Sequence, residues 1–121
     1  MNDCIFCKII NGEIETRKVY EDDKVLVFLD TDPHQNGHML IVPKKHYTDF
    51  TELDNEILCH INSVAKKMKD LVYEKLNANG IRLCVNYGMY QYVKHYHLHI
   101  IPAYKEKQDL IDIDKVYEKL K

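Results

Sequence analysis

The chain has 121 residues, of which 45% are hydrophobic and 30% charged, and its net charge is -2. These values are typical of a globular domain with a buried core and exclude a low-complexity or disordered chain. The near-neutral charge also excludes a broad basic surface, so we expect no nucleic-acid partner. Residues 1–10 lack the pattern of a secretory signal, and no run approaches the roughly 18 apolar residues of a membrane helix. We therefore expect a cytoplasmic protein without a membrane partner.

The first part of the chain predicts one short helix and three strands. Residues 4–10 predict a helix that Asn11 and Gly12 end. Residues 18–20 and 25–30 predict two short strands around a turn, and residues 38–43 predict a third strand after a turn-rich segment.

The second part predicts one long helix and two further strands. Apolar residues recur at helical spacing over residues 52–77, and the lysines and acids there fall largely on the opposite side. These apolar positions are Leu53, Ile57, Leu58, Ile61, Val64, Ala65, Met68, Leu71, Val72 and Leu76. Residues 81–86 and 94–104 predict strands, and the tail from residue 109 predicts a short helix or arm. Segregated helices and strands with short connections predict an α+β fold with an antiparallel sheet of about five strands.

Three histidines alternate with other residues near the end of the chain. In a strand, His95, His97 and His99 would share one face, with about 6.6 Å between neighbours. Imidazoles without partners are unfavourable, so this pattern favours a functional site over a solvated face. Steps of about 6.6 Å make it awkward for all three to bind one zinc ion. A division of roles is easier, with metal at one end and a nucleophile toward phosphorus in the middle.

Four cysteines are present, and in a cytoplasmic protein we do not expect them to form disulfides. The Cys4-x-x-Cys7 pair indicates a metal or redox site. We expect Cys59, on the long helix, and Cys84, in a strand, to be small buried hydrophobic residues.

Several motifs together resemble the histidine triad (HIT) family. The run from His95 to Ile101 resembles its signature, His-φ-His-φ-His-φ-φ, in which φ is apolar. Five other segments resemble the small bacterial branch: Cys4-Ile-Phe-Cys-Lys-Ile-Ile, Val19-Tyr-Glu-Asp-Asp, Phe28-Leu-Asp, Gly37-His and Val42-Pro-Lys-Lys-His46. The resemblance covers about residues 4–104, the expected core of a single HIT-like domain over residues 1–121 with a tail at 105–121. It implies a homodimer and no organic cofactor.

The resemblance implies a hydrolase or nucleotidyl transferase. Such an enzyme cleaves the α-phosphorus bond of a purine nucleoside phosphoramidate or dinucleoside polyphosphate and releases a nucleoside monophosphate. His97 would carry the nucleotidyl group, and His99 would stabilise charge on the phosphate. His95 and His46 would hold the surroundings of His97. The nucleotide-binding positions of the family correspond to Ile5, Phe6, Ile9 and Phe28 at the base, Asp30 at the ribose, and Asn86, Gln91, His97 and His99 at the phosphate and leaving group.

The Cys-x-x-Cys pair adds a zinc site to this resemblance. Related bacterial members use both cysteines, the histidine after Pro-Lys-x and the first triad histidine. Here these ligands are Cys4, Cys7, His46 and His95. A shell of four protein ligands leaves no open position, so this zinc would be structural. From the residues alone, two free buried cysteines remain an alternative.

The loop before the histidines departs from the family pattern. Tyr90 stands where the family has glycine, and Tyr92 where a small residue is common. These tyrosines can narrow the pocket, stack on a base or donate hydrogen bonds. Two alternatives to a hydrolase with a histidine nucleophile remain. One is a nucleotide-binding or interaction module with little catalysis, and the other is a metal-dependent enzyme that uses the histidines as catalytic metal ligands. We interpret His38 as structural, whereas His34 and His60 have no partner that the sequence identifies.

Overall fold

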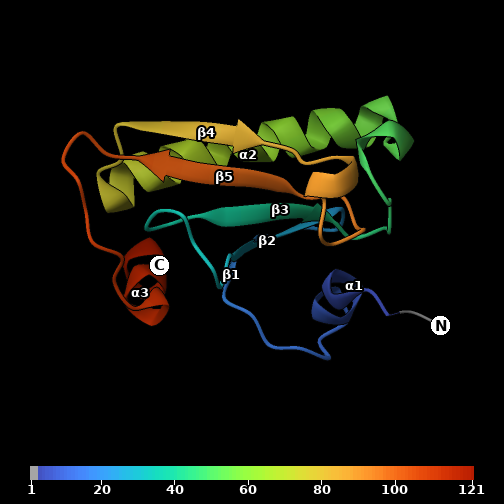
Figure 1. Cartoon of the computed structure of the whole chain (residues 1–121), viewed down its shortest axis with the longest axis horizontal. Coiled ribbons are helices and arrows are strands. Elements are labelled where there is room, and N and C mark those ends of the chain that lie inside the picture. Colours follow the sequence, from blue (N-terminus) through green and yellow to red (C-terminus); the bar gives the residue numbers. More distant parts are fainter. Residues whose placement is uncertain (1–2) are drawn as a thin grey trace.

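The computed structural model describes residues 3–121, which form a five-stranded antiparallel sheet with helices on both faces (Figure 1). The strands are β1 (Lys18–Glu21), β2 (Val25–Leu29), β3 (Met39–Pro43), β4 (Gly80–Cys84) and β5 (Leu98–Ala103), in the order β1-β2-β3-β5-β4. The helices are α1 (Ile5–Ile10), α2 (Asn55–Leu76) and α3 (Ile113–Leu120), with 3-10 turns η1 (Phe50–Glu52) and η2 (Gly88–Tyr90). The predicted α+β class is confirmed. The single domain was predicted over residues 1–121, and residues 1–2 of that range lie outside the described residues.

Two hydrophobic clusters cover opposite faces of the sheet. In β2, Val25, Val27 and Leu29 pack toward α2, which runs behind the sheet in Figure 1. Leu26 and Phe28 point the other way and pack against α1. Because both faces are covered, every residue of β2 and β3 is buried. None of the helices within residues 3–121 is long and apolar enough to span a membrane.

Strands β4 and β5 are covered on one face only. Leu98 and Ile100 of β5 pack toward α2, whereas no described helix crosses the other face of these two strands (Figure 1). His99 pairs with Cys84 across the two strands and shares that open face with it. Cys84 is therefore exposed, and Cys59 is exposed on the outer side of α2. The prediction that both cysteines are buried is wrong, because neither lies on a face that another element covers.

The long helix begins later than the hydrophobic spacing predicted. Asp54 caps it, because its carboxylate accepts the backbone N–H of Ile57 at 2.9 Å. Residues 50–52 form the separate turn η1 instead. Asn77 ends the helix in the left-handed conformation with a φ of 59°. Leu58, predicted to face the core, is 47% exposed because it lies on the outer side of the helix.

The predicted strand over residues 94–104 also begins later, at Leu98. The backbone N–H of Tyr96 donates to the carbonyl of Tyr47 at 2.7 Å, outside the regular pairing of the sheet. Tyr96 still packs toward α2, so the alternation continues. The expectation of three equally spaced histidines on one strand is wrong, however, since His95 and His97 precede the strand in an irregular segment.

The tail is anchored by a helix and a buried asparagine. Val116 and Leu120 of α3 join the cluster on the α2 side of the sheet. Asn36 accepts the backbone N–H of Ile111 at 3.0 Å and donates to the carbonyl of Asp109 at 3.0 Å. The tail thus holds the segment between β2 and β3, which contributes to the site.

Gly37, in that same segment, lies where the surrounding atoms leave no room for a side chain. Its φ is +90°, and an added Cβ would lie 2.5 Å from Cδ1 of Leu76. We expect Gly37→Ala to lower the free energy of unfolding by about 3 kcal/mol, from left-handed strain plus overpacking. Gly12→Ala is the matched control, since Gly12 has a φ of +82° but no atom within 4 Å. Urea denaturation should show a loss of only about 1 kcal/mol for that control. Equal losses in both variants would contradict the steric contribution.

Candidate functional site

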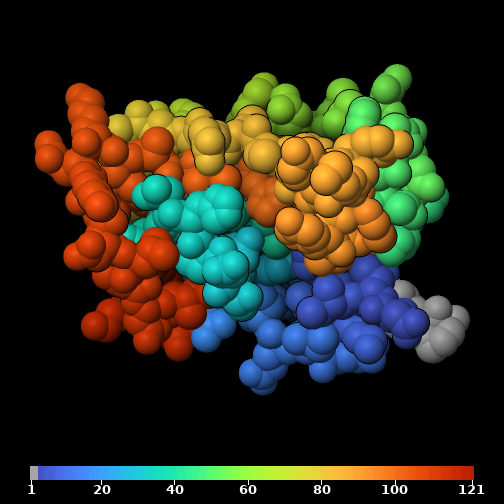
Figure 2. Space-filling model, in the orientation of Figure 1, coloured from blue at the N-terminus to red at the C-terminus, as the bar shows by residue number. Residues whose placement is uncertain are grey.

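A cavity of about 550 Å³ opens on the α1 side of the sheet. Helix α1, the segment after β2 and the loop before the histidines meet around it; they are blue, cyan and orange in Figure 2. The structure brings into its lining every residue predicted to bind the nucleotide except Gln91: Ile5, Phe6, Ile9, Phe28, Asp30, Asn86, His97 and His99.

One end of the cavity is apolar. Phe6 and Phe28 are nearly buried, and their rings meet edge to face with 5.6 Å between centroids. The ring of Phe6 also lies edge-on to His97, with 5.0 Å between centroids. An apolar slot thus adjoins an imidazole, as a planar base beside a phosphate would require.

His97 is held as a neutral imidazole with one exposed lone pair. Its Nδ1 lies 2.8 Å from the carbonyl oxygen of His95. A carbonyl only accepts hydrogen bonds, so Nδ1 carries the proton and Nε2 is the unprotonated nitrogen. Burial lowers the pKa of His97, which keeps the ring neutral at neutral pH. This nitrogen is chemically suited to attack an electrophile in the cavity.

A chain of hydrogen bonds determines which ring nitrogen of His99 carries the proton. The backbone N–H of His34 donates to Nδ1 of His38 at 3.0 Å, so the proton of His38 sits on Nε2. That Nε2–H donates to Nδ1 of His99 at 2.9 Å. His99 therefore carries its own proton on Nε2, 3.5 Å from Nδ2 of Asn86. Two donors then face the same space, an arrangement that suits an oxyanion.

His99 is also neutral. Burial, followed by the neighbouring imidazoles of His97 and His38, lowers its pKa to about 4. The site therefore presents N–H donors rather than imidazolium charges.

The sequence did not predict that His38 donates a hydrogen bond to His99. The register pairs Leu29 with Met39, which brings Asp30 opposite His38. Oδ1 of Asp30 accepts the backbone N–H of Asp32 at 2.8 Å, and Oδ2 lies 3.5 Å from Nε2 of His38. The hairpin pairing of the two predicted strands could have revealed this neighbour.

The loop before the histidines places its tyrosines and its glutamine differently. Tyr90 and Tyr92 line the cavity and are 66% and 89% exposed. Gln91 is buried and donates from Nε2 to the carbonyl of Thr48 at 2.7 Å. Gln91 thus anchors the loop and does not line the cavity, because its side chain is directed to the carbonyl of Thr48.

Cys4, Cys7, His46 and His95 form a second cluster, with their potential ligand atoms within 4.8 Å of one another. Nδ1 of His95 lies 3.4 Å from Sγ of Cys4 and 3.5 Å from Sγ of Cys7. Nδ1 of His46 lies 3.3 Å from Sγ of Cys7. Ligands around a tetrahedral zinc ion are about 3.3 to 3.8 Å apart, from the usual Zn–N and Zn–S distances. These separations and this donor set fit zinc.

The surroundings of His95 support the same interpretation. Its Nε2–H donates to the carbonyl of Pro43 at 2.8 Å, so the lone pair of Nδ1 faces the two sulfur atoms. Histidines that bind metals commonly donate their other N–H in this way. The carbonyl of His95 in turn accepts from His97, so this cluster adjoins the candidate nucleophile.

Asp30, His38 and His99 also place potential ligand atoms within 4.8 Å of one another. Here the tautomer opposes metal binding. Nδ1 of His38 accepts a backbone N–H, so its Nε2 is protonated and has no lone pair for a metal. The geometry therefore favours hydrogen bonding over a catalytic metal at this position.

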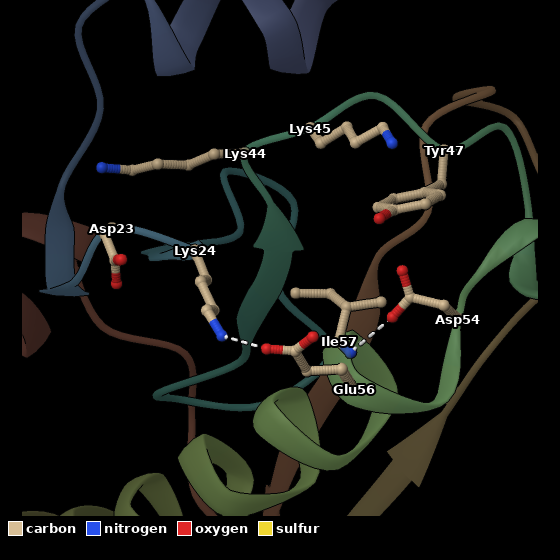
Figure 3. A pocket seen from close by; sticks show the side chains of 8 residues that line it. All are labelled: Asp23, Lys24, Lys44, Lys45, Tyr47, Asp54, Glu56 and Ile57. Carbon is tan, nitrogen blue, oxygen red and sulfur yellow. Dashed lines mark hydrogen bonds and ion pairs between the residues drawn. The ribbon is translucent and has the colours of Figure 1, made fainter.

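A separate hollow of about 230 Å³ lies between the β1–β2 turn and the start of α2 (Figure 3). Its three lysines have partners: Lys24 pairs with Glu56 at 2.9 Å and Lys44 with Glu21 at 2.8 Å, and Nζ of Lys45 lies 5.3 Å from the centroid of the Tyr47 ring. None of the described residues that line it is a histidine. Nearby, His60 lies 2.7 Å from Asp22, which gives this histidine a structural partner. This region therefore links α2 to the turn and is not the candidate site.

Comparisons with known proteins show the family and the fold of the chain. The family model described as HIT domain matches residues 11–106. An uncharacterized HIT-like protein of Methanocaldococcus jannaschii is 43% identical over 98% of both chains. Adenylylsulfatase HINT3 of Arabidopsis thaliana is 40% identical over 90% of this chain and 56% of that protein. A crystal structure of a Zn-bound histidine triad family protein from Mycobacterium smegmatis is 30% identical, with a TM-score of 0.90, and the match covers 98% of this chain and 90% of that one.

Proposed function

Because the chain belongs to the HIT family, we propose that it hydrolyses or transfers the nucleotidyl group of a purine nucleoside phosphoramidate or dinucleoside polyphosphate. The observation that carries this proposal is the unprotonated Nε2 of buried His97, beside two donors and an apolar slot. The similarity to an adenylylsulfatase supports an enzyme that acts on an adenylyl group.

The reaction takes place in two displacements. Nε2 of His97 attacks the α-phosphorus, a P–N bond forms, and the bond to the leaving group breaks with its electron pair. The N–H groups of His99 and Asn86 stabilise the charge on the phosphate oxygens. Water then attacks the same phosphorus and releases a proton to the solvent, the P–N bond breaks, and its electron pair returns to Nε2. A nucleoside monophosphate is released.

The remaining roles follow from the lining of the cavity. The base lies among Ile5, Phe6, Ile9 and Phe28, and Asp30 accepts hydrogen bonds from the ribose hydroxyls. A zinc ion held by Cys4, Cys7, His46 and His95 is structural and supports the segment that carries His97. The proposal includes a single domain over residues 1–121, a homodimer and a cytoplasmic location, where thiols remain reduced.

The second candidate function is a nucleotide-binding module with little catalysis, and the exposed Tyr90 and Tyr92 motivate it. Calorimetry with AMP and a steady-state assay with adenosine 5′-phosphoramidate separate the two. Binding together with turnover supports the enzyme, whereas binding without turnover supports the module. Failure to bind AMP would contradict both.

His38 offers a test of the hydrogen-bond chain. His38→Ala removes the donor that keeps the proton of His99 on Nε2, so we expect kcat to fall about 10- to 100-fold with little change in KM. His38→Gln is the matched control, because its amide N–H can still donate to His99 and should restore much of kcat. Equal kcat values in the two variants would contradict a positioning role for this donor.

A further inference from the structure

Arg82 is a cation on the open face of the sheet, next to the histidines. Cys84 pairs with His99, and Arg82 pairs with Ile101. Arg82 is therefore a diagonal neighbour of His99, about 7–8 Å away across the two strands and within reach of a long side chain. Ile81 packs toward α2, which directs Arg82 to the open face. Arg82 is exposed and forms no ion pair or hydrogen bond with the rest of the described chain.

A hollow of about 440 Å³ lies on this face beyond the cavity. His34 lines both the cavity and the hollow, so the two adjoin. Arg82 and Lys107 are the cations of the hollow and Glu106 its carboxylate. The charge of Lys107 balances that of Glu106, so Arg82 gives these three side chains a net positive charge.

The cavity itself lacks a positive charge. Among the described residues that line it, none is Lys or Arg, whereas Glu15, Asp30 and Asp32 contribute carboxylates. A substrate with negative charge beyond its α-phosphate therefore needs a cation from outside the cavity, and Arg82 is placed to supply it.

We propose that Arg82 binds an anionic leaving group, through phosphate or sulfate oxygens, and thereby favours nucleotides linked to an oxyanion over nucleotides linked to an amine. This inference rests on the proposed function. When the bond from phosphorus to an oxyanion breaks, the electron pair and negative charge stay on the departing oxygen, which a guanidinium stabilises. An amine takes up a proton and leaves as a neutral molecule, so it gains nothing comparable.

Three substrates that share the adenylyl group test this selectivity: adenosine 5′-phosphoramidate, adenosine 5′-phosphosulfate and diadenosine tetraphosphate. We expect Arg82→Gln to lower kcat/KM about tenfold or more for the sulfate and tetraphosphate substrates, the loss of one charge-assisted hydrogen bond. The phosphoramidate should change by less than about twofold. Arg82→Lys should recover part of the loss. Lys66→Gln, an exposed cation on α2, is the matched control and should leave all three substrates unchanged.

Each outcome either supports or overturns the proposal. An equal loss of kcat/KM for all three substrates would mean that Arg82 contacts the adenylyl group or supports the fold, and would overturn the proposal. No loss for any substrate would mean that Arg82 does not contact the leaving group, and would also overturn it. If the unmodified protein turns over none of them, the proposed function fails. Calorimetry then still tests Arg82, because Arg82→Gln should weaken binding of ADP about tenfold and leave AMP unchanged. Equal effects on ADP and AMP would overturn the anion subsite.

Discussion

Replacing His97 with Asn is expected to lower kcat by at least about 1000-fold, because it removes the nucleophilic nitrogen. The amide nitrogen of Asn can still donate to the carbonyl of His95, the bond that Nδ1 of His97 makes at 2.8 Å. The variant should therefore keep its fold and its affinity for AMP. Steady-state turnover of adenosine 5′-phosphoramidate, calorimetry with AMP and urea denaturation measure the three properties separately.

A trapped intermediate gives this prediction a second readout. Rapid mixing of the unmodified protein with substrate, followed by intact-mass analysis, should show one adenylyl group on the chain. His97→Asn should show none, and His97→Ala should behave in the same way. Undiminished turnover in either variant, or an adenylyl group on another residue, would remove His97 from the role of nucleophile.

Removal of the metal is expected to have the second large effect, on stability. Cys7 is buried, and its Sγ lies 3.3 Å from Nδ1 of His46 and 3.5 Å from Nδ1 of His95. Elemental analysis should find one zinc ion per chain in the unmodified protein and none in Cys7→Ser. Cys7→Ser should also lower the free energy of unfolding by about 4 kcal/mol. This is the stabilisation that zinc provides when its free concentration is about 1,000 times its Kd.

Cys59→Ser is the matched control for this variant, because Cys59 is exposed on α2 and far from the other cysteines in sequence. It should keep the zinc ion and the full stability. The chelated protein, assayed at a temperature at which it remains folded, should retain turnover within about tenfold, since a closed Cys₂His₂ shell has no open position for substrate. Turnover that disappears while the fold persists, and returns with added metal, would instead support a catalytic metal.

The position of the cluster of Cys4, Cys7, His46 and His95 is the reason why we expect the two effects to be separable. His95 contributes its Nδ1 to the cysteine side and its backbone carbonyl to His97. Loss of zinc is therefore expected to loosen the support of His97 without removing any of the groups proposed to contact the phosphate. Loss of His97 removes the nucleophile but none of the metal ligands.

Much of the fold could be predicted from local patterns. The helical spacing of the apolar residues in α2 and the continuous apolar runs of β2 and β3 can each be recognised within one segment. The ends of the elements were less accurate, because they depend on single hydrogen bonds such as the cap that Asp54 makes with Ile57.

The sequence by itself determined which chemical groups are present and which segments carry them: the His95–His99 run, the Cys4/Cys7 pair and the apolar residues of α1. Only the tertiary structure decided which groups meet. His38 and His99 are 61 residues apart in the chain and 2.9 Å apart in space. Arg82 lies beside His99 only because β4 pairs with β5 in one register. Such contacts depend on strand order and loop length, which no local period encodes. They place His95 in the cluster with Cys4 and Cys7, and His97 and His99 in the lining of the cavity.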